Sequence, residues 1–157
     1  MRVFDEKSIS VALDVGANIG QYAKELRADG YTGRIVSFEP LSEAFAKLSR
    51  YAAPDKAWEC KRLALGNSEE KRSMNVSGLS YSSSLLPMTD RTIAASPGSK
   101  YVRTEMVNVT RLDLLRNQLF KDTAPVGLKV DVQGYEMQVL QGATEMLGRN
   151  VRVVEAD

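Results

Sequence analysis

The chain has 157 residues, of which 43% are hydrophobic, and this is enough for one domain with its own core. Its 21 basic and 20 acidic residues nearly cancel, so no overall field would attract nucleic acid or an anionic membrane surface. The sequence contains no histidine, which excludes Ser-His-Asp triads, histidine zinc sites and imidazole general bases. Any proton transfer must therefore use Asp, Glu, Lys, Tyr or water.

The cysteine content and the apolar runs indicate a compartment. Cys60 is the single thiol, which excludes an intramolecular disulfide and favours a reducing compartment, so a cytoplasmic protein is expected. Residues 1–10 contain no apolar run of signal-peptide length, and no segment approaches the ~20 apolar residues of a membrane span. We therefore expect a soluble protein without a membrane span and without a nucleic-acid partner.

The first part of the chain alternates between apolar runs and helical periodicity. Strands are predicted at 11–15, 35–38 and 58–65, and helices with apolar spacing i, i+3, i+4, i+7 are predicted at 19–26 and 41–52. A parallel strand pair needs a connection of about the length of a helix, so this alternation predicts a parallel sheet with right-handed crossovers.

The middle third interrupts the alternation. A short extra strand is predicted at 72–76 and another at 106–109, and a Ser-rich tract with few periodic apolar positions lies between them at 78–100. A connection of that length in a compact domain favours a mobile loop that covers the site over a plain disordered insert.

The last third returns to strands and helices. Thr110 is predicted to cap a helix that continues to Leu119, and Gly148 is predicted to stop the helix between strands at 126–132 and 151–154. The fold class is therefore α/β. We predict a single domain over residues 1–157 with a Rossmann-like, doubly wound, mostly parallel sheet of order 3-2-1-4-5 between two helix layers.

Acidic residues follow the predicted strands at one edge of this sheet. Asp14 lies at the end of the first strand, Glu39 ends the second, and Asp131 and Glu155 follow the fourth and fifth. Ligands of open parallel sheets bind at this edge, so these residues predict one site. Because Asp14 would repel a pyrophosphate, the pattern favours a cationic sulfonium cofactor over a dinucleotide, and Glu39 would accept hydrogen bonds from ribose hydroxyls.

Four segments resemble the FkbM-type family of class I S-adenosylmethionine-dependent methyltransferases. They are Leu13-Asp14-Val15-Gly16-Ala17-Asn18-Ile19-Gly20, Phe38-Glu39-Pro40, Ser82-Ser83-Ser84-Leu85, and Leu128-Lys129-Val130-Asp131-Val132-Gln133-Gly134-Tyr135-Glu136 with the helix after it. The resemblance covers residues 11–155. It implies S-adenosyl-L-methionine as the cofactor and methylation of a hydroxyl oxygen on a sugar, glycan or polyketide-type small molecule.

The resemblance also implies roles for individual residues. It places around the cofactor Asp14, Gly16, Asn18, Gly20, Glu39, Leu65, Asn67 and Asp131. Strand alternation puts Lys129 and Asp131 on one face, where they could polarise an acceptor hydroxyl, and the predicted catalytic residues are Asp131, Lys129 and Glu136. No metal is predicted, although a divalent cation between Asp131 and Glu155 is a less favoured alternative.

Structural explanations compete with these roles. Lys129 and Asp131 could form a purely structural ion pair, and Glu136 could be an acidic residue favoured by the helix dipole. Two other functions also remain open, a non-catalytic cofactor-binding or assembly module and a nicotinamide-dependent oxidoreductase, and the acidic strand end disfavours the second.

Two departures from the usual class I fold are expected. No reversed hairpin follows the fifth strand, which leaves a sheet edge through which a homodimer could form, and no helix is expected before the first strand.

Overall fold

The computed structural model describes residues 2–77, 83–85, 101–120 and 123–156, and its main element is a five-stranded sheet. The strands are β1 (Val11–Val15), β2 (Arg34–Phe38), β3 (Trp58–Lys61), β7 (Val126–Val130) and β8 (Val151–Ala156). All neighbours are parallel, in the order β3-β2-β1-β7-β8. This confirms the predicted α/β class and order 3-2-1-4-5, because β7 and β8 are the fourth and fifth strands of this sheet.

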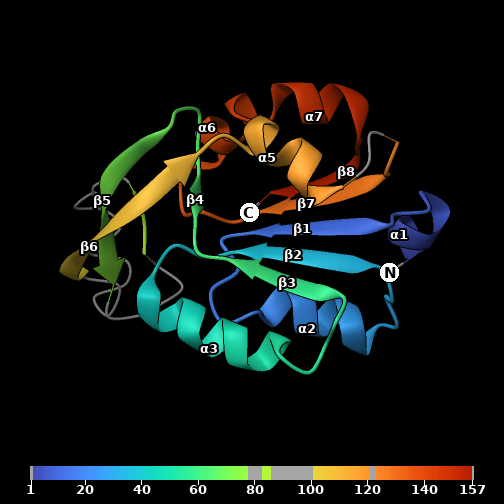
Figure 1. The fold of residues 1–157 in the computed structure, drawn as a ribbon, viewed down its shortest axis with the longest axis horizontal. Helices are drawn as coiled ribbons and strands as arrows, with labels where there is room; N and C mark the ends of the chain where they lie inside the picture. The colour runs from blue at the N-terminus through green and yellow to red at the C-terminus, as the bar shows by residue number, and fades with distance from the viewer. Residues whose placement is uncertain (1, 78–82, 86–100, 121–122, 157) are drawn as a thin grey trace.

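Helices cover both faces of the sheet (Figure 1). One layer contains α2 (Gln21–Ala28) and α3 (Ser42–Ala52), and the other contains α5 (Leu112–Leu119), α6 (Glu136–Gln141) and α7 (Thr144–Arg149). Successive side chains of β1 point to opposite faces, so Leu13 belongs to the core beneath α5 and α7 while Ala12 belongs to the core above α2 and α3. The predicted three-layer arrangement is confirmed.

A short helix, α1 (Arg2–Glu6), precedes β1, so the expectation of no helix there is wrong. It lies at the amino ends of the strands, opposite the edge to which the strand arrows point (Figure 1). Phe4 makes an edge-on ring contact with Tyr31 at 5.4 Å and packs over Gly127, where a Cβ atom would come within 2.7 Å of its ring. One turn of helix is too short to show apolar periodicity, and tertiary packing stabilises it.

A second, three-stranded sheet lies beside the carboxyl ends of the main strands (Figure 1). It consists of β4 (Ala64–Leu65), β6 (Tyr101–Thr110) and β5 (Glu70–Ser77), in that order. The strand predicted at 58–65 is therefore two strands: β3 pairs with β2, and β4 pairs with β6. The β2–β3 pairing ends at Phe38 and Lys61, and after Lys61 the chain turns and joins the other sheet.

Three further predictions concern Thr110, Gly148 and the loop at 78–100. Thr110 is not a helix N-cap: it is the last residue of β6, and Arg111 stands at the N-cap position of α5. Gly148 does not stop its helix, because α7 continues to Arg149, and Gly148 does not adopt the positive φ with which a glycine ends a helix. The predicted mobile loop at 78–100 lies outside the described residues except for 83–85.

The described part of that tract is joined to the second sheet. Ser84 exchanges backbone hydrogen bonds with Asn75 of β5 at 2.9 and 3.1 Å, and its hydroxyl donates to the Gln133 carbonyl at 2.8 Å. Leu85 is buried with Val107 and Tyr135 in the core of this sheet. Over the described residues, no helix combines the length and the apolar character needed to cross a bilayer.

Candidate active site

A pocket of about 290 Å³ opens at the carboxyl ends of β1, β2 and β7, where the second sheet meets the main sheet. Its lining combines the loops after these strands with residues of α2, β4, β5 and β8. The volume is near the lower end of the ~300–1,000 Å³ typical of small-molecule sites. The site therefore lies at the edge that the strand-end acids indicated.

The loop after β1 packs directly on the loop after β7. Gly16 has φ +78°, and a Cβ atom there would lie 1.9 Å from the Asp131 carbonyl oxygen, so only glycine fits. The N–H groups of Gly16 and Ala17 donate to the Phe38 carbonyl at 3.1 and 3.0 Å. This local sequence brings the ends of β1, β2 and β7 together around the pocket.

Glu39 presents a buried carboxyl group to the pocket, with only 6% of the residue exposed. One carboxylate oxygen accepts from the Asn18 N–H at 2.9 Å and the other from the Leu41 N–H at 2.8 Å. Burial raises the pKa of Glu39 to about 7, although these two backbone hydrogen bonds oppose the shift. Each oxygen keeps a further lone pair with which it can accept a hydrogen bond from a ligand.

A lysine stands between two carboxyl groups beneath the pocket. The Lys129 Nζ atom lies 3.4 Å from Asp14 Oδ1 and 3.5 Å from Asp131 Oδ2. Asp14 is 0% exposed, and its other oxygen accepts from the Ser37 hydroxyl at 3.2 Å. Burial raises the pKa of Asp14 by more than the adjacent ammonium group lowers it. With both acids ionised, the three groups together carry one negative charge.

The turn between β7 and α6 is held by Glu136. Its Oε1 atom accepts from the N–H groups of Val132 at 3.2 Å and Gly134 at 2.9 Å, while Gln133 and Gly134 adopt positive φ values of 56° and 96°. The Gln133 side chain in turn donates to Asp131 Oδ1 at 2.8 Å. Glu136 thus stabilises the turn that carries Asp131.

The structure brings together part of the predicted residue set. The pocket lining includes Gly16, Asn18, Glu39, Leu65, Lys129 and Asp131. It does not include Asp14, Gly20, Asn67 and Glu136. Gly20 faces the Trp58 ring, and the Asn67 amide donates to the Gln141 side chain at 2.9 Å, away from the pocket. Direct binding roles of the four residues outside the lining stay predictions that their positions do not support.

Several lining residues were not singled out from the sequence. The Tyr22 hydroxyl of α2 donates to Glu155 Oε2 at 3.4 Å, and its ring centroid lies 5.8 Å from Lys129 Nζ. Burial, and then the charge of Glu155, raises the pKa of Tyr22. The apolar spacing of α2 includes Tyr22 in the helix face that packs on the sheet, but periodicity does not distinguish a core position from one at the pocket rim.

The second sheet supplies an apolar wall. Met74 and Leu85 line the pocket together with Leu41, Ala64 and Tyr135. In the described part of the chain, no group of three or more His, Cys, Asp or Glu side chains is arranged to hold a metal ion. The pocket thus has an apolar side near β4 and β5 and a polar, acidic side near α2, β7 and β8.

Comparison with known proteins adds one finding. No curated protein and no solved structure matched the chain. A family model described as the methyltransferase FkbM domain matches residues 14–157, which includes the Gly16 loop, Glu39, the whole second sheet and the turn at Asp131. The chain therefore belongs to the FkbM methyltransferase family.

Proposed function

We propose that this protein is an S-adenosyl-L-methionine-dependent methyltransferase that methylates a hydroxyl oxygen on a sugar, glycan or polyketide-type small molecule. The observation that carries the proposal is the acidic lining of the pocket, to which Glu39, Asp131 and Glu155 contribute. Carboxylates at the strand ends disfavour a pyrophosphate and favour a cationic ligand with a ribose diol. Both cofactors carry ribose diols, so the discrimination rests on charge: S-adenosyl-L-methionine is cationic and has no pyrophosphate, whereas a nicotinamide dinucleotide has one.

The residues present fit this cofactor. Glu39 would accept hydrogen bonds from the ribose hydroxyls, and the apolar side of the pocket, with Leu63 and Leu65, would hold the adenine ring. With both acids ionised, the Asp14, Lys129 and Asp131 group would carry one negative charge, which suits a neighbouring cation. When bound, the cofactor supplies an electrophilic methyl group on a sulfonium centre.

The polar side of the pocket would take the acceptor. Asp131 is the proposed base, because its Oδ2 atom is close to Lys129 and its side chain is 32% exposed, so a hydroxyl proton can reach it. Lys129 would hold the Asp131 side chain in place through the contact at 3.5 Å, without leaving its buried position. Tyr22 and Glu155 offer further hydrogen-bonding groups, which favours an acceptor with several hydroxyls.

The compartment and the assembly remain proposals. Cys60 is half-buried, burial raises the pKa of its thiol to about 11, and a single thiol of this kind fits a reducing compartment such as the cytoplasm. In the described residues β8 is one edge of the main sheet, and Val154 on it is 47% exposed. A homodimer through this edge stays a prediction that sedimentation analysis can test.

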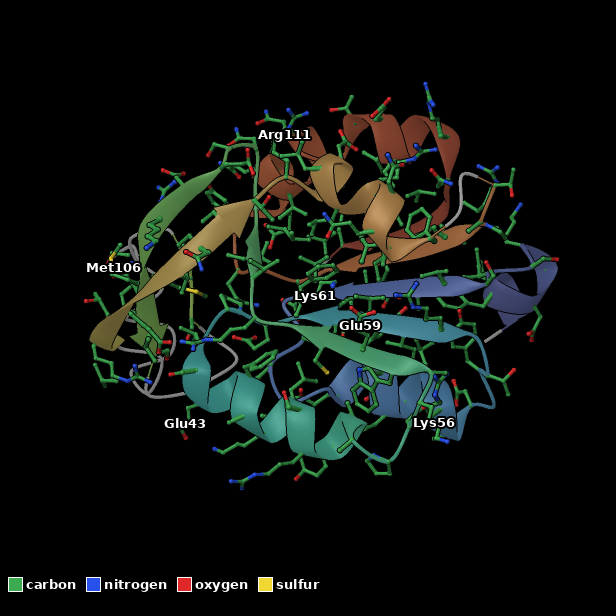
Figure 2. All side chains as sticks on the ribbon, viewed as in Figure 1. Glu43, Lys56, Glu59, Lys61, Met106 and Arg111 are labelled. Carbon is green, nitrogen blue, oxygen red and sulfur yellow. The ribbon has the colours of Figure 1, made fainter. Side chains whose placement is uncertain are left out.

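Calorimetric titration with S-adenosylhomocysteine tests the cofactor. We expect saturable binding by the wild-type chain and a loss of about tenfold or more in affinity for Glu39→Ala, because a hydrogen bond to a charged group is worth roughly 1.5–3 kcal/mol. Glu59→Gln is the matched control, since Glu59 is a surface acid on β3 that pairs with Lys61 outside the pocket lining (Figure 2).

Titration with NADH should give no saturable binding. A correctly folded wild-type chain that binds NADH and not S-adenosylhomocysteine would refute the proposal. Binding of S-adenosylhomocysteine without turnover on any hydroxylated acceptor would instead favour a non-catalytic cofactor-binding module.

A further inference from the structure

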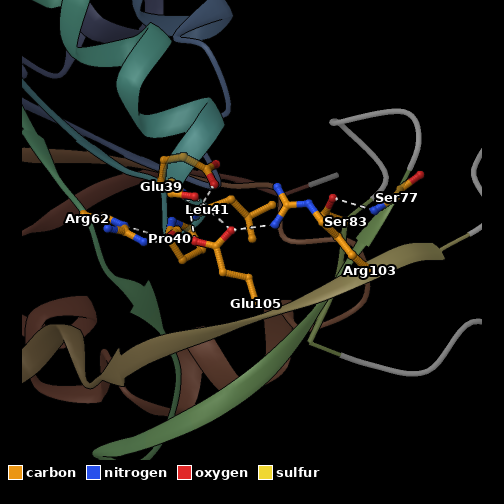
Figure 3. Close-up of polar contacts among 9 residues, drawn as sticks. Glu39, Pro40, Leu41, Arg62, Ser77, Ser83, Arg103 and Glu105 are labelled. Carbon is orange, nitrogen blue, oxygen red and sulfur yellow. Dashed lines mark hydrogen bonds and ion pairs between the residues drawn. The ribbon is translucent and has the colours of Figure 1, made fainter.

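Glu105 on β6 collects four hydrogen-bond donors from three residues (Figure 3). Its Oε1 atom accepts from the Ser42 N–H and from Arg62 Nη2, both at 2.9 Å. Its Oε2 atom accepts from the Ser42 hydroxyl and from Arg103 Nη1, both at 3.0 Å. Burial opposes ionisation, but these hydrogen bonds together lower the pKa of Glu105, so it is charged at neutral pH.

Two of these partners border the segment that carries Glu39. Ser42 is the first residue of α3, directly after Leu41, whose N–H donates to Glu39. Arg62 also donates through Nε to the Pro40 carbonyl at 3.4 Å, and the residue before it, Lys61, accepts the Glu39 N–H at 3.1 Å. Glu105 is therefore connected to Glu39 from both sides of the turn at Pro40.

The N-terminus of α3 lacks a hydrogen-bond acceptor of its own, so an acid from another element has to supply one. α3 has Leu41 at its N-cap position, and a leucine side chain cannot accept a hydrogen bond from the first turn. Glu105, on β6 of the second sheet, provides that acceptor, and its negative charge is favourable at the N-terminus of α3. Arg62 and Arg103 have side chains that are 50% and 45% exposed, so their ion pairs alone contribute little.

We propose that Glu105 is a positioning residue for the ribose site: it fixes the Pro40–Ser42 turn and thereby the Glu39 carboxylate. The inference rests on the proposed function, because it assumes that Glu39 holds the ribose. It assigns the second sheet a role in the cofactor site, since β6 carries the group that orders the turn after β2.

A double-mutant cycle separates positioning from a general structural role. Glu105→Ala should weaken S-adenosylhomocysteine binding about tenfold, and this loss should largely disappear in a Glu39→Gln background, where no carboxylate remains to be positioned. Glu105→Gln keeps an oxygen for the Ser42 N–H and should recover most of the affinity. Glu59→Gln, which removes an acid from the main sheet, should leave the affinity unchanged.

Hydrogen exchange supplies a readout that needs no ligand. The Leu41 amide, which donates to Glu39 and not to Glu105, should exchange faster in Glu105→Ala than in the wild type. Thermal unfolding establishes that each variant is folded, and if Glu105→Ala does not fold, Glu105→Gln combined with Ser42→Ala takes its place.

The outcomes distinguish failure of the Glu105 inference from failure of the proposed function. Wild-type affinity in a folded Glu105→Ala protein, or full additivity with Glu39→Gln, overturns the inference and leaves the proposed function intact. Absence of binding by the folded wild type overturns the proposed function instead. In that event the Leu41 exchange rate still decides whether Glu105 orders the turn.

Discussion

At the residue scale, Glu39 shows how burial and hydrogen bonding compete at one side chain. Two backbone N–H groups donate to its carboxylate, yet removal from water dominates and raises its pKa to about 7. The native state therefore binds a proton more tightly than the unfolded chain, in which the carboxyl titrates near 4.5. Its stabilising contribution is fully present below the unfolded pKa and is lost as the pH rises through the native pKa.

Because the native pKa of Glu39 lies above its unfolded value, the stability of the wild type should depend on pH, and Glu39→Gln should remove this dependence. Between about pH 4.5 and pH 8 the unfolding free energy of the wild type should fall, relative to the variant, by about 3 kcal/mol. Urea denaturation of both proteins across this range measures the difference. Asp14, whose pKa is also raised, is present in both proteins, so most of its contribution cancels; the charge repulsion between Asp14 and Glu39 belongs to the measured difference. Parallel stability curves for the two proteins would contradict the expectation.

At the element scale, two helices receive their N-terminal acceptors from other elements. Glu105 does this for α3, and Asp113 of α5 does it for α7. The two Asp113 oxygens accept from the N–H groups of Glu145 at 3.1 Å and Met146 at 2.9 Å. α7 has only six residues, and Ala143 at its N-cap makes no side-chain hydrogen bond. Such a short helix depends on tertiary contacts for its stability.

Asp113→Ala should therefore destabilise the protein by about 1–2 kcal/mol, the usual cost of removing a capping acid, and urea denaturation measures the change. Glu43→Ala is the control, because Glu43 is an exposed acid in the first turn of α3 that pairs with the exposed Lys47 (Figure 2). We expect no measurable change for the control. Equal effects of the two substitutions would show that Asp113 does not support α7.

At the scale of the whole molecule, the second sheet is fixed to the helix layer by close contact between two glycines. A Cβ atom on Gly142, between α6 and α7, would lie 1.9 Å from the Gly66 carbonyl oxygen beside β4. The Gly142 carbonyl accepts from the Asp113 N–H at 3.0 Å. Gly142 has φ −80°, which any residue adopts, so the requirement for glycine here comes from the contact alone.

Gly142→Ala should accordingly push the second sheet away from the helix layer at α6 and α7. We expect a loss of about 1–3 kcal/mol in unfolding free energy, typical of an overpacked contact, together with weaker S-adenosylhomocysteine binding. Gly148→Ala is the matched control. Gly148 lies within α7, and apart from the helix's own backbone no heavy atom of the described residues lies within 4 Å of its Cβ position. Alanine should therefore stabilise the helix by about 0.5–1 kcal/mol. Denaturant unfolding and calorimetry distinguish the two results.

The amino-acid pattern alone predicts the parallel sheet, its strand order and the sheet edge at which the pocket lies. Alternating apolar strands and helices specify the sheet, and Gly16, Glu39 and Asp131 follow their strands within a few residues. These signals are local, because a strand, a turn and the acid that follows are neighbours along the chain. For that reason Gly16, Glu39 and Asp131 line the pocket, whereas Asp14, which is fully buried within β1, does not.

The way in which distant segments complete that edge depends on the packing of the folded chain. Residues 58–65 divide between two sheets, since β3 pairs with β2 and β4 pairs with β6. Glu105 accepts a hydrogen bond from Ser42 across 63 residues of sequence. The Tyr22 hydroxyl donates to Glu155 across 133 residues of sequence. Such contacts leave no periodicity or spacing in the chain, since they depend on which surfaces come together when the two sheets pack.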